Sequence, residues 1–350
     1  MGDLIMTGPA IRALKDSFGA RITVLTSSMA KGIINYMPEI DDAIIYDLPW
    51  VKTAETPDAH TFNDVVSDIK ERQFDAAVIF TVYSQNPLPA AMLAYLAGIP
   101  KILAYCRENP YHLITDWVPD KEPYEFIKHQ VTRDLDLAAT VGAFTTNNNL
   151  YLNTDGISWQ PVQHKLNATG VDASKPWLIL HAGVSEKKRE YPAEKLAEAA
   201  KKLIADKGYQ ILLTGSAAEK QLTDELAGLI GEGSFSVAGL FNLGEFICLV
   251  KQAPVMLSVN TGTVHIAAAV GTPVVVLYAQ TNPQHTPWNV TNQVLPYPVP
   301  QNMRSKNEVI AYVNNTLYNK PVAIPSVNEI VNAVNELTGQ AYQLNRFPEY

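Results

Sequence analysis

The amino-acid sequence predicts an α/β protein made of two doubly wound units, each a parallel sheet covered by helices. Short β-branched runs alternate with amphipathic stretches of helical length along most of the chain, as buried parallel strands and their crossover helices do. The alternation stops at an Asn-rich stretch, 145–154, and a looser segment up to Pro176, and then restarts. The length of 350 residues suits two domains of about 150 residues each.

The first half begins with a basic amphipathic helix at 10–18 and continues as strands and helices in turn. The predicted strands are rich in Val, Ile and Thr, and the predicted helices carry apolar residues at helical spacing. We expect the strands at 21–26, 43–46, 76–80 and 102–104, and the helices at 28–36, 61–72, 89–97 and 124–141.

The second half repeats the pattern from the apolar strand WLILH at 177–181. The helix that follows has Pro192 in its first turn, where a missing N–H is tolerated. The Pro- and Asn-rich segment 282–324 is expected to be irregular. Further strands are expected at 210–214, 234–238, 255–258 and 273–278, and helices at 192–206, 219–230, 243–252, 262–269 and 326–338.

These elements divide the chain into an N-terminal domain at 1–160 and a C-terminal domain at 161–325. A C-terminal helix and tail at 326–350 follow, with the option of packing back on the N-terminal domain. Two doubly wound domains in tandem leave a cleft between them, which is where such folds bind ligands.

Composition excludes several classes of function. The net charge of -8 and the lack of a basic run argue against a nucleic-acid partner. Cys106 and Cys248 lie far apart and lack the partners of a zinc site or a disulfide framework, which favours a reducing compartment. The sequence has no secretory signal pattern and no apolar run long enough to span a membrane, so a cytoplasmic location is expected.

Nucleotide signatures of the two commonest kinds are missing. No G-x-G-x-x-G follows a predicted strand, and no Walker A sequence occurs. A dehydrogenase or a kinase is therefore disfavoured, and attention moves to strand ends that turn into helices through small polar residues.

The strongest of these turns is SVNTGTVH, 258–265. A strand ends at Ser258, and Thr261 and Gly262 open a helix whose unpaired N–H groups suit a diphosphate. His265 lies one turn further on, on the face that Thr261 shares. The alternative is that Asn260 or Thr261 is only an N-cap and His265 only a core histidine.

A second turn, HAGVSEKKREYP at 181–192, also joins a strand to a helix. Gly183 and Ser185 allow a close backbone approach to a ligand. The run Lys187, Lys188 and Arg189 is the densest basic cluster in an acidic chain, and one of its members could neutralise a departing diphosphate. An ordinary solvated loop is the competing interpretation.

Two carboxylates lie at helix entrances. Glu219 follows a glycine turn, LTGSAAE, where it could accept hydrogen bonds from a ribose diol or serve only as a favourable first-turn charge. Asp3 follows Gly2 ahead of the first helix, and is either an N-cap or a general base that faces the cleft.

Together these residues resemble glycosyltransferase family 9, the heptosyltransferases, over nearly the whole chain. The similar segments are GDLIMTGPAIRALKDSFGARITVLTS, AAMLAYLAGIPKILAY, LTGSAAE and SVNTGTVHIAAAVGTPVVVLYAQTNP. The resemblance implies a GT-B fold, with the acceptor on the N-terminal domain and the nucleotide sugar on the C-terminal one. In the family a first β-strand precedes the Gly-Asp pair, so here either the N-terminal domain lacks that strand or Met1 is not the true start.

The resemblance also implies an inverting displacement without a metal or other cofactor, from an ADP-sugar to a lipopolysaccharide-core acceptor. A lipid-linked acceptor would bring the enzyme into peripheral contact with the inner membrane. Asp3 matches the family's catalytic aspartate, and Lys188 its phosphate-binding residue, with Arg189 as the competing match. The implied donor-binding residues are Gly183, Ser185, Arg189, Glu219, Phe241, Asn260, Thr261, Gly262 and His265.

Three departures bear on the site. Asn260 stands where many members have Asp, which removes a charge near the sugar. Glu190 and Tyr191 replace a basic or polar residue and a Trp, and Ala279 and Gln280 replace Gly-Pro. Two other functions stay open: a nucleotide-sugar-binding protein without transfer activity, and a nucleotide-sugar epimerase, for which no clear second acid/base residue is found.

Overall fold

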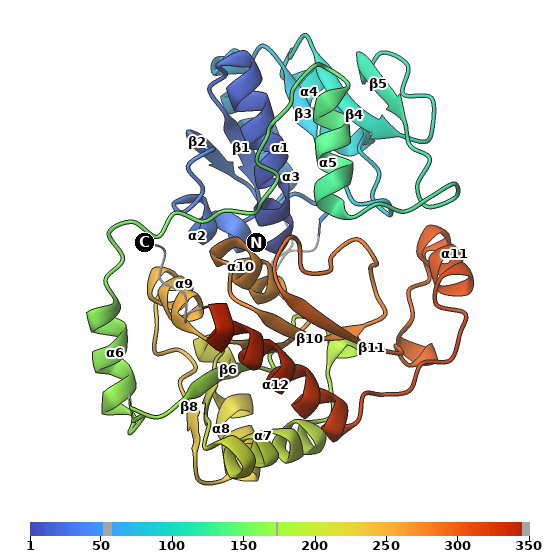
Figure 1. The fold of residues 1–350 in the computed structure, drawn as a ribbon. Coiled ribbons are helices and arrows are strands. Elements are labelled where there is room, and N and C mark those ends of the chain that lie inside the picture. The colour runs from blue at the N-terminus through green and yellow to red at the C-terminus, as the bar shows by residue number, and fades with distance from the viewer. Residues whose placement is uncertain (52–57, 173, 345–350) are drawn as a thin grey trace.

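The computed structural model describes residues 1–51, 58–172 and 174–344, which form two α/β units stacked one above the other (Figure 1). The N-terminal unit holds parallel strands with helices on both faces, as the sequence predicts. Its strands are β1 (Thr23–Thr26), β2 (Asp42–Ile45), β3 (Ala77–Ile79), β4 (Ile102–Cys106) and β5 (Asp116–Pro119), and its helices are α1 (Gly2–Phe18), α2 (Lys31–Ile34), α3 (Ala59–Glu71), α4 (Leu88–Leu96) and α5 (Gln130–Ala139).

The strands of the N-terminal unit form two separate sheets. Strand β1 pairs with β2, and β3, β4 and β5 pair in that order, all in parallel. Among the described residues no strand bridges β1 and β3. Instead the facing edges of β1 and β3 line a groove that continues into the cleft between the units.

The C-terminal unit contains one continuous six-stranded parallel sheet in the order β11-β10-β9-β6-β7-β8. The strand order runs outward from β6 in both directions, so this half is doubly wound as predicted. Its strands are β6 (Trp177–His181), β7 (Gln210–Leu213), β8 (Ser234–Ser236), β9 (Met256–Val259), β10 (Val274–Ala279) and β11 (Asn292–Tyr297), and its helices are α6 (Trp159–Ala168), α7 (Ala193–Lys207), α8 (Lys220–Ile230), α9 (Leu243–Gln252), α10 (Gly262–Val270), α11 (Glu308–Thr316) and α12 (Val327–Leu344).

Alternate residues of the central strands feed two cores, one on each face of this sheet. In β6, Leu178 and Leu180 face the core under α7 and α12, whereas Ile179 faces the core under α6, α9 and α10. The second core also takes up Ile5 and Met6 of α1, so the first helix of the N-terminal unit is anchored in the C-terminal one. This packing fixes the start of α1 beside α10.

Helix α12 packs on α7, β10 and β11 of the C-terminal unit. The suggested return of the last segment to the N-terminal domain is therefore wrong for this helix, because its buried face completes the C-terminal core through Ile330, Val334 and Leu337. The rest of the tail, 345–350, lies outside the described residues.

Several boundaries differ from the prediction for physical reasons. Helix α1 begins at Gly2 and continues through Pro9, so it is eight residues longer at its start than the predicted 10–18. Strand β5, which has only four residues, was not predicted, and neither was helix α6, in which half of the residues are polar and Pro161 lies in the first turn. The segment 282–324 is not irregular throughout, since it contains β11 and α11, and the Asn307 side chain caps the latter. None of the described helices is both long and apolar enough to cross a bilayer.

Candidate functional site

The two strongest sequence motifs meet where the strand order of the C-terminal sheet changes direction. Strands β6 and β9 are neighbours, with His181 opposite Ser258 in their register, and each continues into one of the motifs. In open α/β sheets ligands bind outside the carboxyl ends of the strands at such a switch point. The topology therefore brings the turns after His181 and after Ser258 into one cavity of about 1560 Å³ between the units.

Helix α10 begins at this cavity with free N–H groups. Thr261 is its N-cap residue, but its hydroxyl lies 2.7 Å from Thr263 Oγ1 and makes no side-chain cap. A Cβ on Gly2 would lie 2.8 Å from His265 Cδ2 and 3.3 Å from Gly262 Cα, so α1 and α10 begin face to face. Two positive helix ends at one point favour an anionic ligand.

His265 and Arg189, in the wall of this cavity, each have a buried polar atom without a hydrogen-bond partner. Both residues line the cavity, and neither His265 Nδ1 nor Arg189 Nε has a hydrogen-bond partner. Burial, reinforced by the nearby cations, holds the pKa of His265 well below its usual value, so its imidazole is neutral. Because unpartnered buried polar groups are costly, this pair indicates that a polar ligand belongs here.

The structure favours Arg189 over Lys188 as the cationic residue of the cavity. Lys188 is not among the cavity-lining residues, and its Nζ lies 3.2 Å from Glu186 Oε2. Arg189 lines the cavity, contacts the same carboxylate at 3.4 Å, and donates to Asn260 O at 3.5 Å. Of the two alternatives left open by the sequence, the geometry supports the second.

The side chain of Asn260 uses its hydrogen-bonding groups to join the ends of two strands. Its Oδ1 accepts from Ala279 N at 3.1 Å, and its Nδ2 donates to Thr281 Oγ1 at 3.2 Å and to Ala279 O at 3.4 Å. Both amide protons are thus used within the protein. The side chain fixes the end of β9 against the end of β10, which is a structural role within the cavity wall.

Glu219 and Gly183 pack against each other. A Cβ on Gly183 would lie 2.0 Å from Glu219 Oε1, so only glycine allows this approach. Glu219 Oε2 accepts from Ser216 N at 2.7 Å and from its Oγ at 2.8 Å, forming a capping box. Glu219 thus caps the turn that opens its helix, and Oε1 is the oxygen placed toward the turn at Gly183. Ser185 also lines the cavity.

Phe241 lies in an apolar part of the wall with Leu243 and Phe246. Phe246 packs near His181, with ring centroids 6.3 Å apart, and Lys165 Nζ lies 5.9 Å from the centre of the Phe241 ring. Such a wall suits the flat face of a nucleobase.

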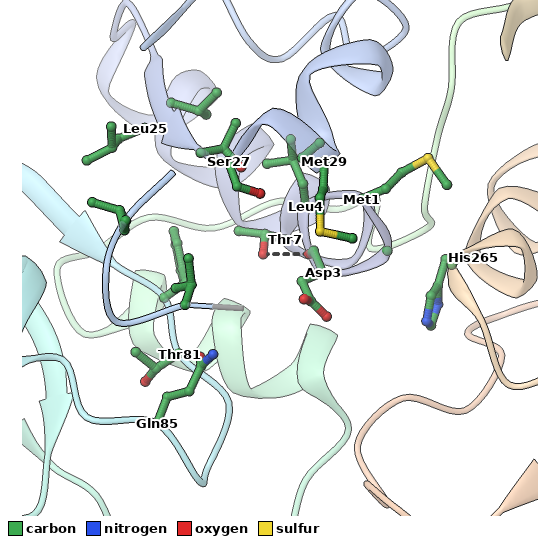
Figure 2. Close-up of a pocket in the computed structure, with 18 of the residues that line it drawn as sticks. Met1, Asp3, Leu4, Thr7, Leu25, Ser27, Met29, Thr81, Gln85 and His265 are labelled. Atoms are coloured by element: carbon green, nitrogen blue, oxygen red, sulfur yellow. Dashed lines mark hydrogen bonds between the residues drawn. The ribbon is translucent and has the colours of Figure 1, made fainter. Parts of the chain in front are cut away.

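Asp3 projects into the cavity from the first turn of α1, with His265 across from it on α10 (Figure 2). Met1 is the N-cap residue, so Asp3 is not the cap, and its side chain is 78% exposed. Its carbonyl accepts from Thr7 Oγ1 at 3.0 Å, and Thr7 Oγ1 lies 2.9 Å from the buried carboxylate of Asp134. An exposed carboxylate on a fixed turn is free to meet a substrate hydroxyl.

The structure adds residues that sequence reasoning did not select. Tyr278 near the end of β10, and Asn282 and His285 from the segment after it, line the same cavity. No motif marked His285, because it lies in a stretch whose composition indicated only a loop. Within the described part of the chain, no three His, Cys, Asp or Glu side chains gather as a metal site would require.

Comparisons with known proteins agree with this geometry. Lipopolysaccharide heptosyltransferase 2 of Escherichia coli (strain K12) is 26% identical over 301 residues, which are 82% of each chain. Lipooligosaccharide heptosyltransferase 2 of Haemophilus influenzae is 24% identical over 307 residues, covering 82% of this chain and 83% of that one.

Solved structures share the fold. The glycosyl transferase family 9 protein from Veillonella parvula DSM 2008 superposes with a TM-score of 0.75 at 17% identity, over 97% of this chain and 94% of that one. The E. coli ADP-heptose lps heptosyltransferase II gives a TM-score of 0.70 at 20% identity, over 97% and 96%. The architecture is thus GT-B. The model of glycosyltransferase family 9 (heptosyltransferase) matches residues 64–310, more than half of the sequence, and the chain belongs to this family of glycosyltransferases.

Proposed function

We propose that this glycosyltransferase moves a heptose or a related sugar from an ADP-sugar to a lipopolysaccharide-core type acceptor, by an inverting displacement that needs no metal. The relatives with this activity in their names match four-fifths of the chain. The observation that carries the donor assignment is the convergence of Arg189, His265 and the start of α10 on one cavity. A diphosphate offers oxygens to this set of donors.

The chemistry follows from where charge develops. The acceptor hydroxyl oxygen attacks the anomeric carbon while the bond from that carbon to the β-phosphate oxygen breaks, and ADP leaves with the electron pair. Arg189 and the N–H groups of α10 stabilise the charge that grows on the β-phosphate, and these are fixed dipoles that need no reorganisation. Asp3 takes the proton of the acceptor hydroxyl. No cofactor other than the donor substrate enters this scheme.

The apolar wall at Phe241, Leu243 and Phe246 takes the adenine in this proposal, and the N-terminal unit takes the acceptor. A sugar acceptor carried on a lipid would bring the enzyme to the cytoplasmic surface of the inner membrane.

The proposal is tested first by ligand-induced thermal shifts. ADP and ADP-heptose should raise the midpoint of unfolding, since a ligand at 100 times its Kd stabilises the fold by about 2.7 kcal/mol, whereas UDP and GDP should have smaller effects. A preference for UDP or GDP would discard the ADP-sugar donor.

Transfer is tested with Asp3→Ala, which should bind ADP as the wild type does but turn over about 10²- to 10⁴-fold more slowly. Asp16→Asn, a change at an exposed carboxylate near the other end of the same helix, is the matched control and should leave kcat unchanged. Full activity of Asp3→Ala would refute the assignment of the base. Nucleotide binding with no turnover of any acceptor by the wild type would favour a binding protein.

A further inference from the structure

The loop 282–289, called here the crossing loop, reaches from the C-terminal unit into the N-terminal one. Its residue Gln284 is fully buried. The Gln284 amide donates to Glu122 Oε2 at 2.6 Å and to Lys128 O at 3.1 Å, and its Oε1 accepts from Tyr83 N at 3.2 Å. Every polar atom of this side chain is satisfied by the other unit.

The crossing loop also contacts the N-terminal unit through residues that follow His285 in the chain. His129 Nε2 lies 2.8 Å from Thr286 O, and the rings of His129 and Trp288 are 4.5 Å apart. Trp288 Nε1 donates to Asn148 O at 2.7 Å. The backbone at His285 is thus fixed from both sides by contacts between the units, at a place that neither unit would define alone.

His285 faces Asp3 across the boundary between the units. Its Nε2 lies 3.9 Å from Asp3 Oδ1, and its side chain is 20% exposed against 78% for Asp3. Because the Asp3 side chain is free to turn, a rotation of its carboxylate brings the two groups to hydrogen-bonding distance. Catalytic contacts of this kind are often long before substrate binds.

Hydrogen bonds around Asn282 decide which nitrogen of His285 carries a proton. Asn282 Oδ1 accepts from Gln284 N at 2.9 Å, which fixes the orientation of the amide. Asn282 Nδ2 therefore points at His285 Nε2, 3.3 Å away, and an amide nitrogen can only donate. In the neutral ring Nε2 is then the acceptor, and the proton is on Nδ1.

The surroundings keep the ring neutral. Burial, together with the positive charge of Arg189 and of His129, lowers the pKa of His285 to about 4, against an opposing effect of Asp3. An acceptor nitrogen beside an ionised carboxylate has no proton to share with it. Nε2 has a single lone pair, which Asn282 Nδ2 meets only at the long distance of 3.3 Å. Once Asp3 takes up a proton, its O–H is the stronger donor and takes this lone pair in place of the amide.

We propose that His285 is a positioning residue for Asp3, whose Nε2 accepts a hydrogen bond from the Asp3 carboxyl group after that group has taken the proton of the sugar acceptor. This inference rests on the proposed function. The acceptor O–H bond breaks, the proton moves to one Asp3 oxygen, and the O–H so formed points at His285 Nε2. The interaction exists only after proton transfer, so it favours transfer without tightening the binding of either substrate.

Two substitutions separate this role from mere packing. His285→Gln keeps a hydrogen-bond acceptor, whereas His285→Leu keeps bulk and loses it. We expect His285→Leu to lower kcat about 10- to 100-fold with the KM for ADP-heptose within about twofold of wild type, because the lost interaction belongs to the transition state. His285→Gln should recover most of the loss. Thermal unfolding of both variants shows whether the fold is kept, and His164→Gln, at an exposed position of α6, is the matched control.

The double variant with Asp3→Asn sharpens the test. If His285 acts through Asp3, changing both residues costs no more than changing Asp3 alone, since the two effects share one step. Equal activity of His285→Leu and wild type, or equal losses in the Gln and Leu variants, would overturn the inference while leaving the proposed function intact. Full activity of Asp3→Ala would overturn both.

Discussion

The two units of this enzyme differ in how completely their sheets are built. The C-terminal sheet is continuous across six strands, and its central strands β7, β9 and β10 are buried along their whole length. The N-terminal strands form two separate sheets, and β1 and β3 are only half-buried along the groove between them. The C-terminal sheet has a buried core on each face, whereas the N-terminal unit draws part of its packing from the C-terminal one through Ile5 and Met6.

That dependence is visible at the site. The donor side of the cavity is formed by turns that leave β6 and β9, so the C-terminal sheet alone sets their geometry. Asp3 is placed differently, because Ile5 and Met6 of the same helix are buried in the C-terminal core. Asp3, the proposed base, is therefore positioned by both units, because α1 packs on α5 of its own unit as well as on α10.

The largest expected effect comes from replacing one leucine by alanine in each unit, which tests the contrast between their sheets. Leu257 is fully buried in β9, and Leu25 is a half-buried residue of β1 at the groove. Leu257→Ala should lower the free energy of unfolding by about 3–5 kcal/mol, and Leu25→Ala by about 1 kcal/mol, because only the first opens a cavity in a closed core. Hydrogen exchange of amides in β6 and β9, compared with β1 and β2, measures each loss locally. Equal losses would contradict the contrast.

Gln284→Ala tests how far the N-terminal unit depends on the crossing loop. The change removes the donors to Glu122 Oε2 and Lys128 O and the acceptor for Tyr83 N. Buried groups left without partners should cost about 2–3 kcal/mol in total. We expect faster hydrogen exchange in 81–86 and 122–133 with little change in the C-terminal strands.

ADP affinity of the Gln284→Ala variant should stay close to that of the wild type, since the donor turns lie on the other sheet. Gln301→Ala, at an exposed position of the same unit, serves as the control. A loss of stability spread evenly over both units would show that they fold as one body and that the crossing loop has no local role.

The difference between the two units also bears on how much of the structure the sequence could predict. The apolar runs located five of the six C-terminal strands to within two residues, since a buried parallel strand must be apolar throughout. The edge strand β11, which is only partly buried, was missed. The motif turns were also found, and Asp3, Arg189, Thr261, Gly262 and His265 do meet in one cavity. Where a strand leads directly into a helix, the residues of the turn are adjacent in the sequence. Such a turn can therefore be recognised from the sequence alone.

The sequence could not show features that depend on distant partners. Asn260 pairs with Ala279 across two strands, and His285 approaches Asp3 from the other end of the chain. The choice of Arg189 over Lys188 is a matter of which side of a turn faces the cavity. None of these has a periodic or compositional signal, because each is decided by tertiary packing alone.

The smallest expected effect concerns a buried carboxyl group under the base. Asp134 accepts from Gln130 Nε2 at 2.7 Å and lies 2.9 Å from Thr7 Oγ1, and burial raises its pKa to about 7. A raised carboxyl pKa means that the folded state holds the proton more tightly than the unfolded one. The contribution of Asp134 to stability is therefore largest below pH 4, falls as the pH rises from about 4 to 7, and is level above that window.

Asp134→Asn removes this dependence while keeping a side chain of the same shape, whose amide can donate to Thr7 and whose oxygen can accept from Gln130. Since one pKa unit corresponds to about 1.4 kcal/mol, the variant should gain at least about 1 kcal/mol on the wild type between pH 5 and pH 8. Urea unfolding at the two pH values measures the gain, with Asp155→Asn, at an exposed carboxylate, as the control. Parallel pH profiles of wild type and Asp134→Asn would mean that the Asp134 carboxyl is ionised in the fold, and the turn that carries Asp3 would then rest on a buried charge.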